Sequence, residues 1–154
     1  MASPSSRSTP VDWLPVKDFS AGGRTIPIRR LRVYLAFPLR PGLGTSPKAH
    51  ECWVDSGAPL SVIPFRLHQH LEWQSLGYPT TWHSTSCTLG TIEVWLPNEN
   101  YTALRGPRTM VAKFPDSDPP DKPLPILLGL EFFWSNQANL TLWPPPGRGA
   151  IRIP

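Results

Sequence analysis

The sequence predicts an all-β protein with one or two short helices, built as a single domain of ordinary size. Its 154 residues are 40% hydrophobic, which supplies enough apolar material for a core at this length. The 21 prolines and 11 glycines recur throughout the chain. Because proline lacks a backbone donor and disrupts helix interiors, this spacing favours short strands joined by turns.

The predicted domain is preceded by a flexible arm. Residues 1–24 are rich in Ser, Pro and Gly and have few periodic apolar positions, whereas 25–144 should form the domain and 145–154 a C-terminal tail. From Ile26 to Phe37, apolar and polar residues alternate, which predicts a strand. The alternation shifts once at Arg29-Arg30, as a β-bulge would cause.

The middle of the chain is predicted to hold a tight turn between two apolar strands. His50 to Val54 forms the first strand, Asp55-Ser56-Gly57 the turn, and Leu60 to Ile63 the second strand. The stretch from Phe65 to Leu76 is then expected to be a short helix, because its apolar spacing is followed by a glycine that can cap a helix end.

The second half is predicted to be mostly β as well. Residues 80–96 alternate as a hairpin does, with Gly90 as its natural turn, and 109–114 supplies another strand. Three further elements close the domain: an apolar strand, one or two helical turns and a final strand, expected at 126–129, 130–135 and 139–143.

The charge pattern argues against nucleic acid as a partner. The formal net charge is +4, but only 17% of residues are charged, and the basic ones are spread along the chain. Arg29, Arg30 and Arg32 lie close together, yet alternation in a strand divides them between two faces, which is typical of a solvated edge. A basic stripe interleaved with aromatic side chains is missing.

No cofactor, metal or membrane contact is expected. Cys52 and Cys87 are too few for a disulfide scaffold or a zinc cluster. His68 and His70 have no acidic or cysteine partner nearby, so they are interpreted as structural rather than as metal ligands. The start of the chain lacks the apolar run of a signal peptide, and no apolar stretch is long enough for a membrane helix, which predicts a cytoplasmic protein.

Asp55 lies in a turn between two apolar runs, where a carboxylate without a function is unusual. An Asp-Ser-Gly turn alone says little, because these residues are common in turns. Here, however, the whole segment from Val54 to Ile63 resembles the signature of the retroviral-type, or retropepsin-like, aspartic proteases: an apolar strand, Asp-Thr/Ser-Gly-Ala, and a second apolar strand containing a hydroxyl residue.

A second mark of the same family follows in the correct order. Leu127-Leu128-Gly129, leading into a short helix, resembles the paired aliphatic residues and glycine of these enzymes. The resemblance spans roughly 26–143 and implies a small closed β-barrel, in which this segment lies beside the catalytic loop and supports it. It also implies that Asp55 is the catalytic carboxylate.

The resemblance implies a homodimeric peptidase, because the Asp-Ser-Gly triplet occurs once in the chain. Hydrolysis of a peptide by this mechanism needs two carboxylates that share one proton, one to activate water and one to polarise the carbonyl. A symmetric dimer would supply Asp55 twice. Ser56 would then offer its hydroxyl across the dimer axis, and Gly57 would allow the tight backbone turn.

The resemblance also assigns substrate contacts to Ala58 and to a hairpin that closes over the peptide, expected at 84–94 with Gly90 near its tip. Trp53 is a candidate for shaping the cleft. Pro59 and Leu60 depart from the family pattern, which has polar residues that hold the substrate. Two alternatives stay open: a module of the same fold that dimerises or binds peptides without hydrolysis, and a basic β-barrel that binds nucleic acid.

Overall fold

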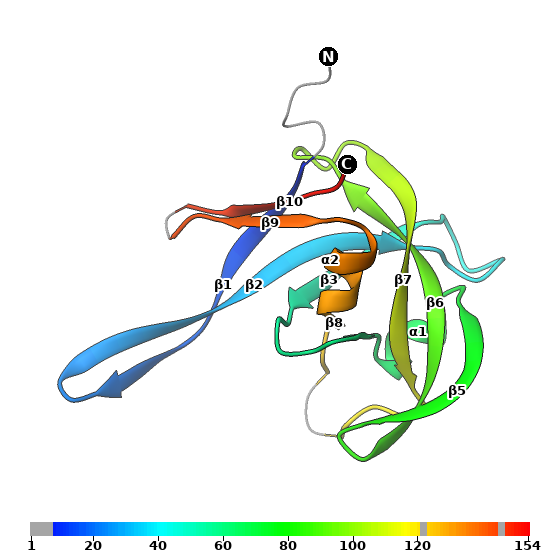
Figure 1. The fold of residues 1–154 in the computed structure, drawn as a ribbon, viewed down its shortest axis with the longest axis horizontal. Coiled ribbons are helices and arrows are strands. Elements are labelled where there is room, and N and C mark those ends of the chain that lie inside the picture. Colours follow the sequence, from blue (N-terminus) through cyan, green and yellow to red (C-terminus); the bar gives the residue numbers. More distant parts are fainter. Residues whose placement is uncertain (1–7, 121–122, 145–146) are drawn as a thin grey trace.

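A computed structural model of the chain describes residues 8–120, 123–144 and 147–154, and these are mostly β-sheet (Figure 1). The described part contains ten strands in one sheet and two short helices. In chain order the elements are β1 (Ser8–Ala21), β2 (Arg24–Phe37), β3 (Lys48–Val54), β4 (Ser61–Val62), α1 (Phe65–His68), β5 (Gln74–Trp82), β6 (Thr85–Pro97), β7 (Leu104–Pro115), β8 (Ile126–Leu128), α2 (Leu130–Ser135), β9 (Asn139–Leu142) and β10 (Gly149–Arg152).

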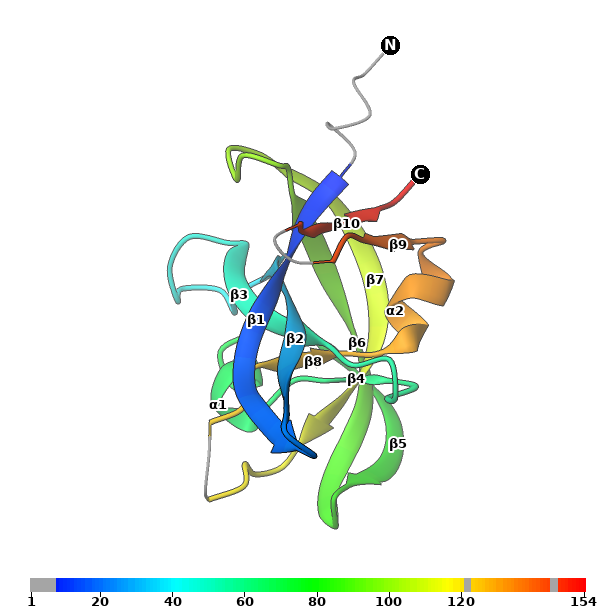
Figure 2. The ribbon, with the colours of Figure 1, turned by 90° about the vertical axis from the view of Figure 1, so that its left-hand side faces the viewer.

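The sheet bends back on itself. Its strand order is β5-β6-β7-β4-β8-β3-β2-β1-β10-β9, and β6 also pairs with β2 through Trp95 and Ala36. Most neighbours are antiparallel, but β3 runs parallel to β8 and β4 runs parallel to β7. The two parallel pairs bring the middle of the chain next to its last third, and β8 continues directly into α2 (Figure 2).

The core lies on one side of the central strands. Along β2, the alternate residues Leu31, Val33 and Leu35 pack into it, as strand geometry requires. Other strands, α2 and the residue after β4 contribute buried apolar side chains, among them Cys52, Ile63, Val94, Met110, Phe114, Ile126, Leu128 and Phe132. Within the described residues, no helix is long and apolar enough to cross a membrane.

The predicted N-terminal arm and C-terminal tail are wrong where the structure describes them. β1 pairs with β2 from Val11 to Ala21, and its first residues pair with β10. β10 in turn pairs with β9, so the supposed tail is an inner strand of the sheet. These strands could not be predicted from the sequence because pairing with distant strands, rather than local strand propensity, stabilises them. Residues 1–7 and 145–146 lie outside the described part.

The β1–β2 hairpin contains the irregularity expected near Arg29-Arg30, but the extra residue is in the other strand. The register shifts between Pro15 and Lys17, opposite Arg29 and Ile28. The far end of this hairpin extends away from the rest of the ribbon (Figure 1).

The expected hairpin turn at Gly90 is wrong. β5 and β6 pair from Gln74 to Thr91, and their turn is at His83 and Ser84, both of which have positive φ. Gly90 is buried inside β6, opposite Ala112 of β7. A Cβ there would lie 2.6 Å from the Trp73 ring, so glycine serves packing at this position.

The helix predicted from Phe65 to Leu76 is also wrong in length. α1 covers only Phe65–His68, and β5 begins at Gln74. Gly77 is not a helix cap: with φ of +75° it lies at the irregular pairing between Ser75 and Tyr78 in β5. Glycine adopts this backbone conformation without the steric cost that a Cβ brings.

Candidate active site around Asp55

Asp55 directly follows β3 and begins the turn that leads to β4. The backbone N–H of Ala58 donates to the carbonyl of Asp55 at 3.1 Å and closes this turn. The N–H of Gly57 donates to Oδ1 of Asp55 at 3.1 Å, which fixes one carboxylate oxygen inside its own loop. Among the described residues, no Lys, Arg or His lies within ion-pair distance of this carboxylate.

β8 holds the Asp55 loop from the side. The N–H of Asp55 donates to the carbonyl of Leu128 at 2.9 Å, and this bond extends the parallel pairing of β3 and β8 by one step. In that pairing Trp53 lies opposite Leu127. The structure therefore brings Leu127 and Leu128 next to the residues that the sequence singled out in the turn.

Gly129 lies where no other residue fits without movement. A Cβ at this position would be 2.6 Å from the carbonyl oxygen of Leu60 and 2.8 Å from that of Ala58. The N–H of Gly129 donates to the hydroxyl of Ser61 at 3.0 Å, and Ser61 is fully buried. The hydroxyl residue of β4 therefore joins the two marks of the motif by a hydrogen bond.

The first turn of α2 continues this contact. The N–H of Leu130 donates to the carbonyl of Ala58, and that of Glu131 donates to the carbonyl of Pro59, each at 2.9 Å. These two donors have no partner inside their own helix, because the first N–H groups of a helix never do. The loop after Asp55 thus caps α2, and α2 holds the loop.

Ser56 and Gly57 form the exposed tip of the loop. The Ser56 side chain makes no hydrogen bond with any other described residue, so its hydroxyl is available to a second molecule. Gly57 does not have positive φ, and a Cβ there would meet Oδ1 of Asp55 at 3.4 Å, an ordinary contact. The turn itself therefore does not require glycine, contrary to the expectation.

Sequence reasoning missed one residue beside the site. The guanidinium of Arg30 lies over the ring of Trp53, 4.0 Å from its centroid. Arg30 was grouped with its neighbours as part of a solvated edge. Strand alternation predicts which face of β2 carries Arg30, but the sequence does not show that β3, which carries Trp53, pairs with β2. Gly90, by contrast, is packed between Trp73 and Phe114 and offers no surface to a substrate.

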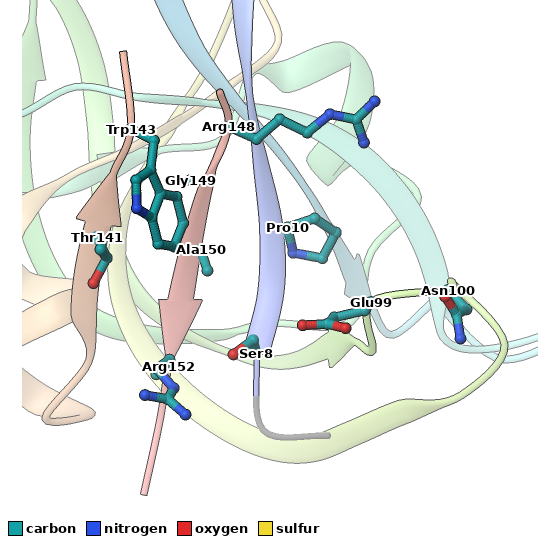
Figure 3. Close-up of a pocket in the computed structure, with 10 residues that line it drawn as sticks. All are labelled: Ser8, Pro10, Glu99, Asn100, Thr141, Trp143, Arg148, Gly149, Ala150 and Arg152. Carbon is teal, nitrogen blue, oxygen red and sulfur yellow. The ribbon is translucent and has the colours of Figure 1, made fainter. Parts of the chain in front are cut away.

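Two hollows of the surface lie away from Asp55. One, of about 570 Å³, is lined by residues of β1, β9, β10 and the loop after β6, together with Trp143 and Arg148 from the connection between β9 and β10 (Figure 3). The other, of about 660 Å³, lies between the loop after β2 and α1. Neither includes a residue of the Asp55 turn.

The described residues give little support for a cysteine nucleophile or a metal site. Burial raises the pKa of the Cys52 thiol strongly and that of Cys87 to a lesser extent, which keeps both in the unreactive protonated form. Within the described residues, no three His, Cys, Asp or Glu side chains are grouped to hold a metal ion.

The chain matches no protein-family model, no curated protein and no solved structure. No relative therefore indicates its function. The functional interpretation depends on the motif and on the contacts around Asp55.

Proposed function

We propose that the chain is one subunit of a homodimeric aspartic endopeptidase of the retropepsin type, with a closed β-barrel subunit and Asp55 as the catalytic residue. The observation that carries the proposal is the support of the Asp55 turn. Leu128 accepts a hydrogen bond from the backbone of Asp55, and Gly129 is joined to Ser61 in the strand that follows the turn. Two motifs about 70 residues apart thus meet in one hydrogen-bonded loop that presents a single carboxylate.

The second carboxylate would come from a second copy. Peptide hydrolysis without a metal or a covalent intermediate uses one carboxylate to take a proton from water and a protonated one to polarise the scissile carbonyl. The Asp-Ser-Gly triplet occurs once in this chain. A twofold axis close to Asp55 would place two identical loops face to face and allow them to share one proton.

Two features of the single chain favour this arrangement. Ser56 and Gly57 are exposed at the tip of the loop, and the Ser56 hydroxyl has no partner among the described residues. Neither of the two hollows described above contains a residue of the Asp55 turn, so under this proposal the peptide cleft is completed by the second subunit. An extended peptide would lie in the completed cleft and pair with the strands that border it.

The direct test is an Asp55→Asn variant. It should dimerise like the parent protein, because the amide keeps the size and an acceptor oxygen for the Gly57 N–H. Cleavage of casein or of a random peptide mixture should fall to background, and pepstatin should inhibit the parent protein. Asp18→Asn is the matched control, since this acid is exposed on the β1–β2 hairpin and should leave cleavage unchanged.

Undiminished cleavage by pure Asp55→Asn protein would refute the proposed catalytic role. A parent protein that dimerises and binds peptides but never cleaves them would instead support the alternative, a non-catalytic module of the same fold.

A further inference from the structure

Three arginines of β2 differ in their partners. Arg29 lies 3.5 Å from Asp18, and Arg32 lies 3.4 Å from Glu51. Arg30 has no carboxylate of any described residue within 4.0 Å, and its guanidinium instead covers the ring of Trp53. A half-buried positive charge on an aromatic ring is therefore left without an anionic partner.

Arg30 and Trp53 lie on the same face as Asp55. Leu31 in β2 packs against the core, and so does Val54 in β3, so the residues that precede them point to the other face. β2 and β3 are neighbours, with Arg32 opposite Trp53. The same alternation, carried one residue beyond β3, directs Asp55 to the face that bears Trp53.

The contact with Trp53 prepares Arg30 to bind an anion. A guanidinium 4.0 Å above the centre of an indole ring is held by cation–π attraction, which restricts its motion and removes part of its hydration. The N–H groups of a guanidinium form a planar fork that can donate to both oxygens of a carboxylate. Trp53 is thus a support, and Arg30 is the group that would contact the ligand.

We propose that Arg30, positioned by Trp53, determines specificity by selecting peptides with an acidic side chain close to the scissile bond. The proposal rests on the proposed function, because it places a peptide across Asp55. Asp55 itself lies beyond ion-pair distance of Arg30, so an acidic side chain of the substrate would not have to displace an internal partner. Trp53 and the neighbouring Leu127 would form the apolar floor beneath that side chain.

The test compares matched peptides. A library with randomised positions is digested first, and the cut sites are read by mass spectrometry; Glu and Asp should be enriched at one position near the cut. A fluorogenic peptide with Glu at that position should then have kcat/KM roughly tenfold or more above its Gln counterpart, as a charge-assisted hydrogen bond provides. Arg30→Gln should bring the two peptides to nearly equal values.

Three further variants guard against a general loss of structure. Arg30→Glu should reverse the preference and favour Lys over Glu at the same position. Arg29→Gln, on the opposite face of β2, should keep the preference of the parent protein. Trp53→Leu should weaken the preference while Arg30 is still present, because the guanidinium loses its support.

The outcomes separate this inference from the proposed function. Cleavage with no preference for acidic residues, or an acidic preference that survives Arg30→Gln, would overturn the inference and leave the peptidase intact. Absence of cleavage for every peptide of the library would overturn the proposed function, and with it the role of Arg30.

Discussion

At the scale of single residues, the hydroxyl of Ser61 links the two halves of the candidate site. It is fully buried and accepts a hydrogen bond from the backbone N–H of Gly129, a position where a Cβ would clash with the backbone of Leu60 and Ala58. Ser56, five residues earlier, has the same side chain in an exposed position without an intrachain hydrogen bond. The two serines therefore allow a matched comparison.

Ser61→Ala should lower the free energy of unfolding by about 1–3 kcal/mol, because the buried N–H of Gly129 loses its acceptor. Ser56→Ala should change it by no more than about 0.5 kcal/mol in dilute protein, as exposed substitutions usually do. Urea unfolding of both variants checks this. Equal stability losses in the two variants would contradict the assigned roles. Sedimentation should show that Ser56→Ala weakens self-association instead.

The sequence was informative about these residues because the motif depends on short-range chemistry. The motif predicts that Leu127-Leu128-Gly129 lies beside the Asp55 turn, and the structure places the two segments side by side, with Ser61 as the hydroxyl residue of the second strand. The pairing of Arg30 with Trp53 could not be predicted. It depends on the register between β2 and β3, which strand alternation alone does not specify.

At the scale of elements, α1 packs against the sheet through a cluster of aromatic rings. The ring of His68 makes edge contacts with Phe65, Trp73 and Phe114. Its Nε2 lies 2.6 Å from the carbonyl oxygen of Pro115, which can only accept, so this nitrogen carries the proton. Its Nδ1 is buried without a partner among the described residues. The neutral ring is therefore the form that fits.

This cluster predicts a loss of stability in mild acid. Burial lowers the pKa of His68 below the value near 6.5 of an unfolded chain, despite the opposing effect of the Pro115 hydrogen bond. Protons then bind His68 more readily in the unfolded state than in the folded state. The free energy of unfolding therefore keeps its full value above pH about 6.5 and decreases as the pH falls below it. The urea midpoint should follow this course.

The control for this prediction is His68→Gln, whose amide N–H can still reach the carbonyl of Pro115 but does not titrate. The decline between pH 7 and pH 5 should be shallower in this variant. Part of the decline should persist, because burial also lowers the pKa of His50. An identical decline in parent and variant would show that His68 does not contribute.

Elements were predicted best where a continuous apolar run met a clear stop. The strand at 126–128 and the helix Leu130–Ser135 agree with expectation. The hairpin turn was missed because His83 and Ser84 adopt positive φ without the Asn-Gly signal that usually marks such a turn. Gly90 was mistaken for a turn residue, since the sequence cannot distinguish a glycine needed for φ from one needed for packing.

At the scale of the whole molecule, the chain supplies a single Asp-Ser-Gly carboxylate, and the proposed function requires a second copy to supply the other. The Asp55 loop is held from two sides by β8 and α2, whereas its tip, with Ser56 and Gly57, faces outward. Under the proposed function, this loop forms a complete site only together with the same loop of a second copy. Activity should therefore depend on the assembly of two copies rather than on the folding of one.

The most direct measurement mixes parent protein with Asp55→Asn protein. If two Asp55 carboxylates from different subunits form the site, subunits exchange into mixed dimers that contain one carboxylate and do not cleave. An equal amount of variant should reduce the activity of a fixed amount of parent protein to about half, and a larger excess should reduce it further. Activity that stays constant at every ratio, after subunit exchange has been verified by mass spectrometry, would contradict the shared site.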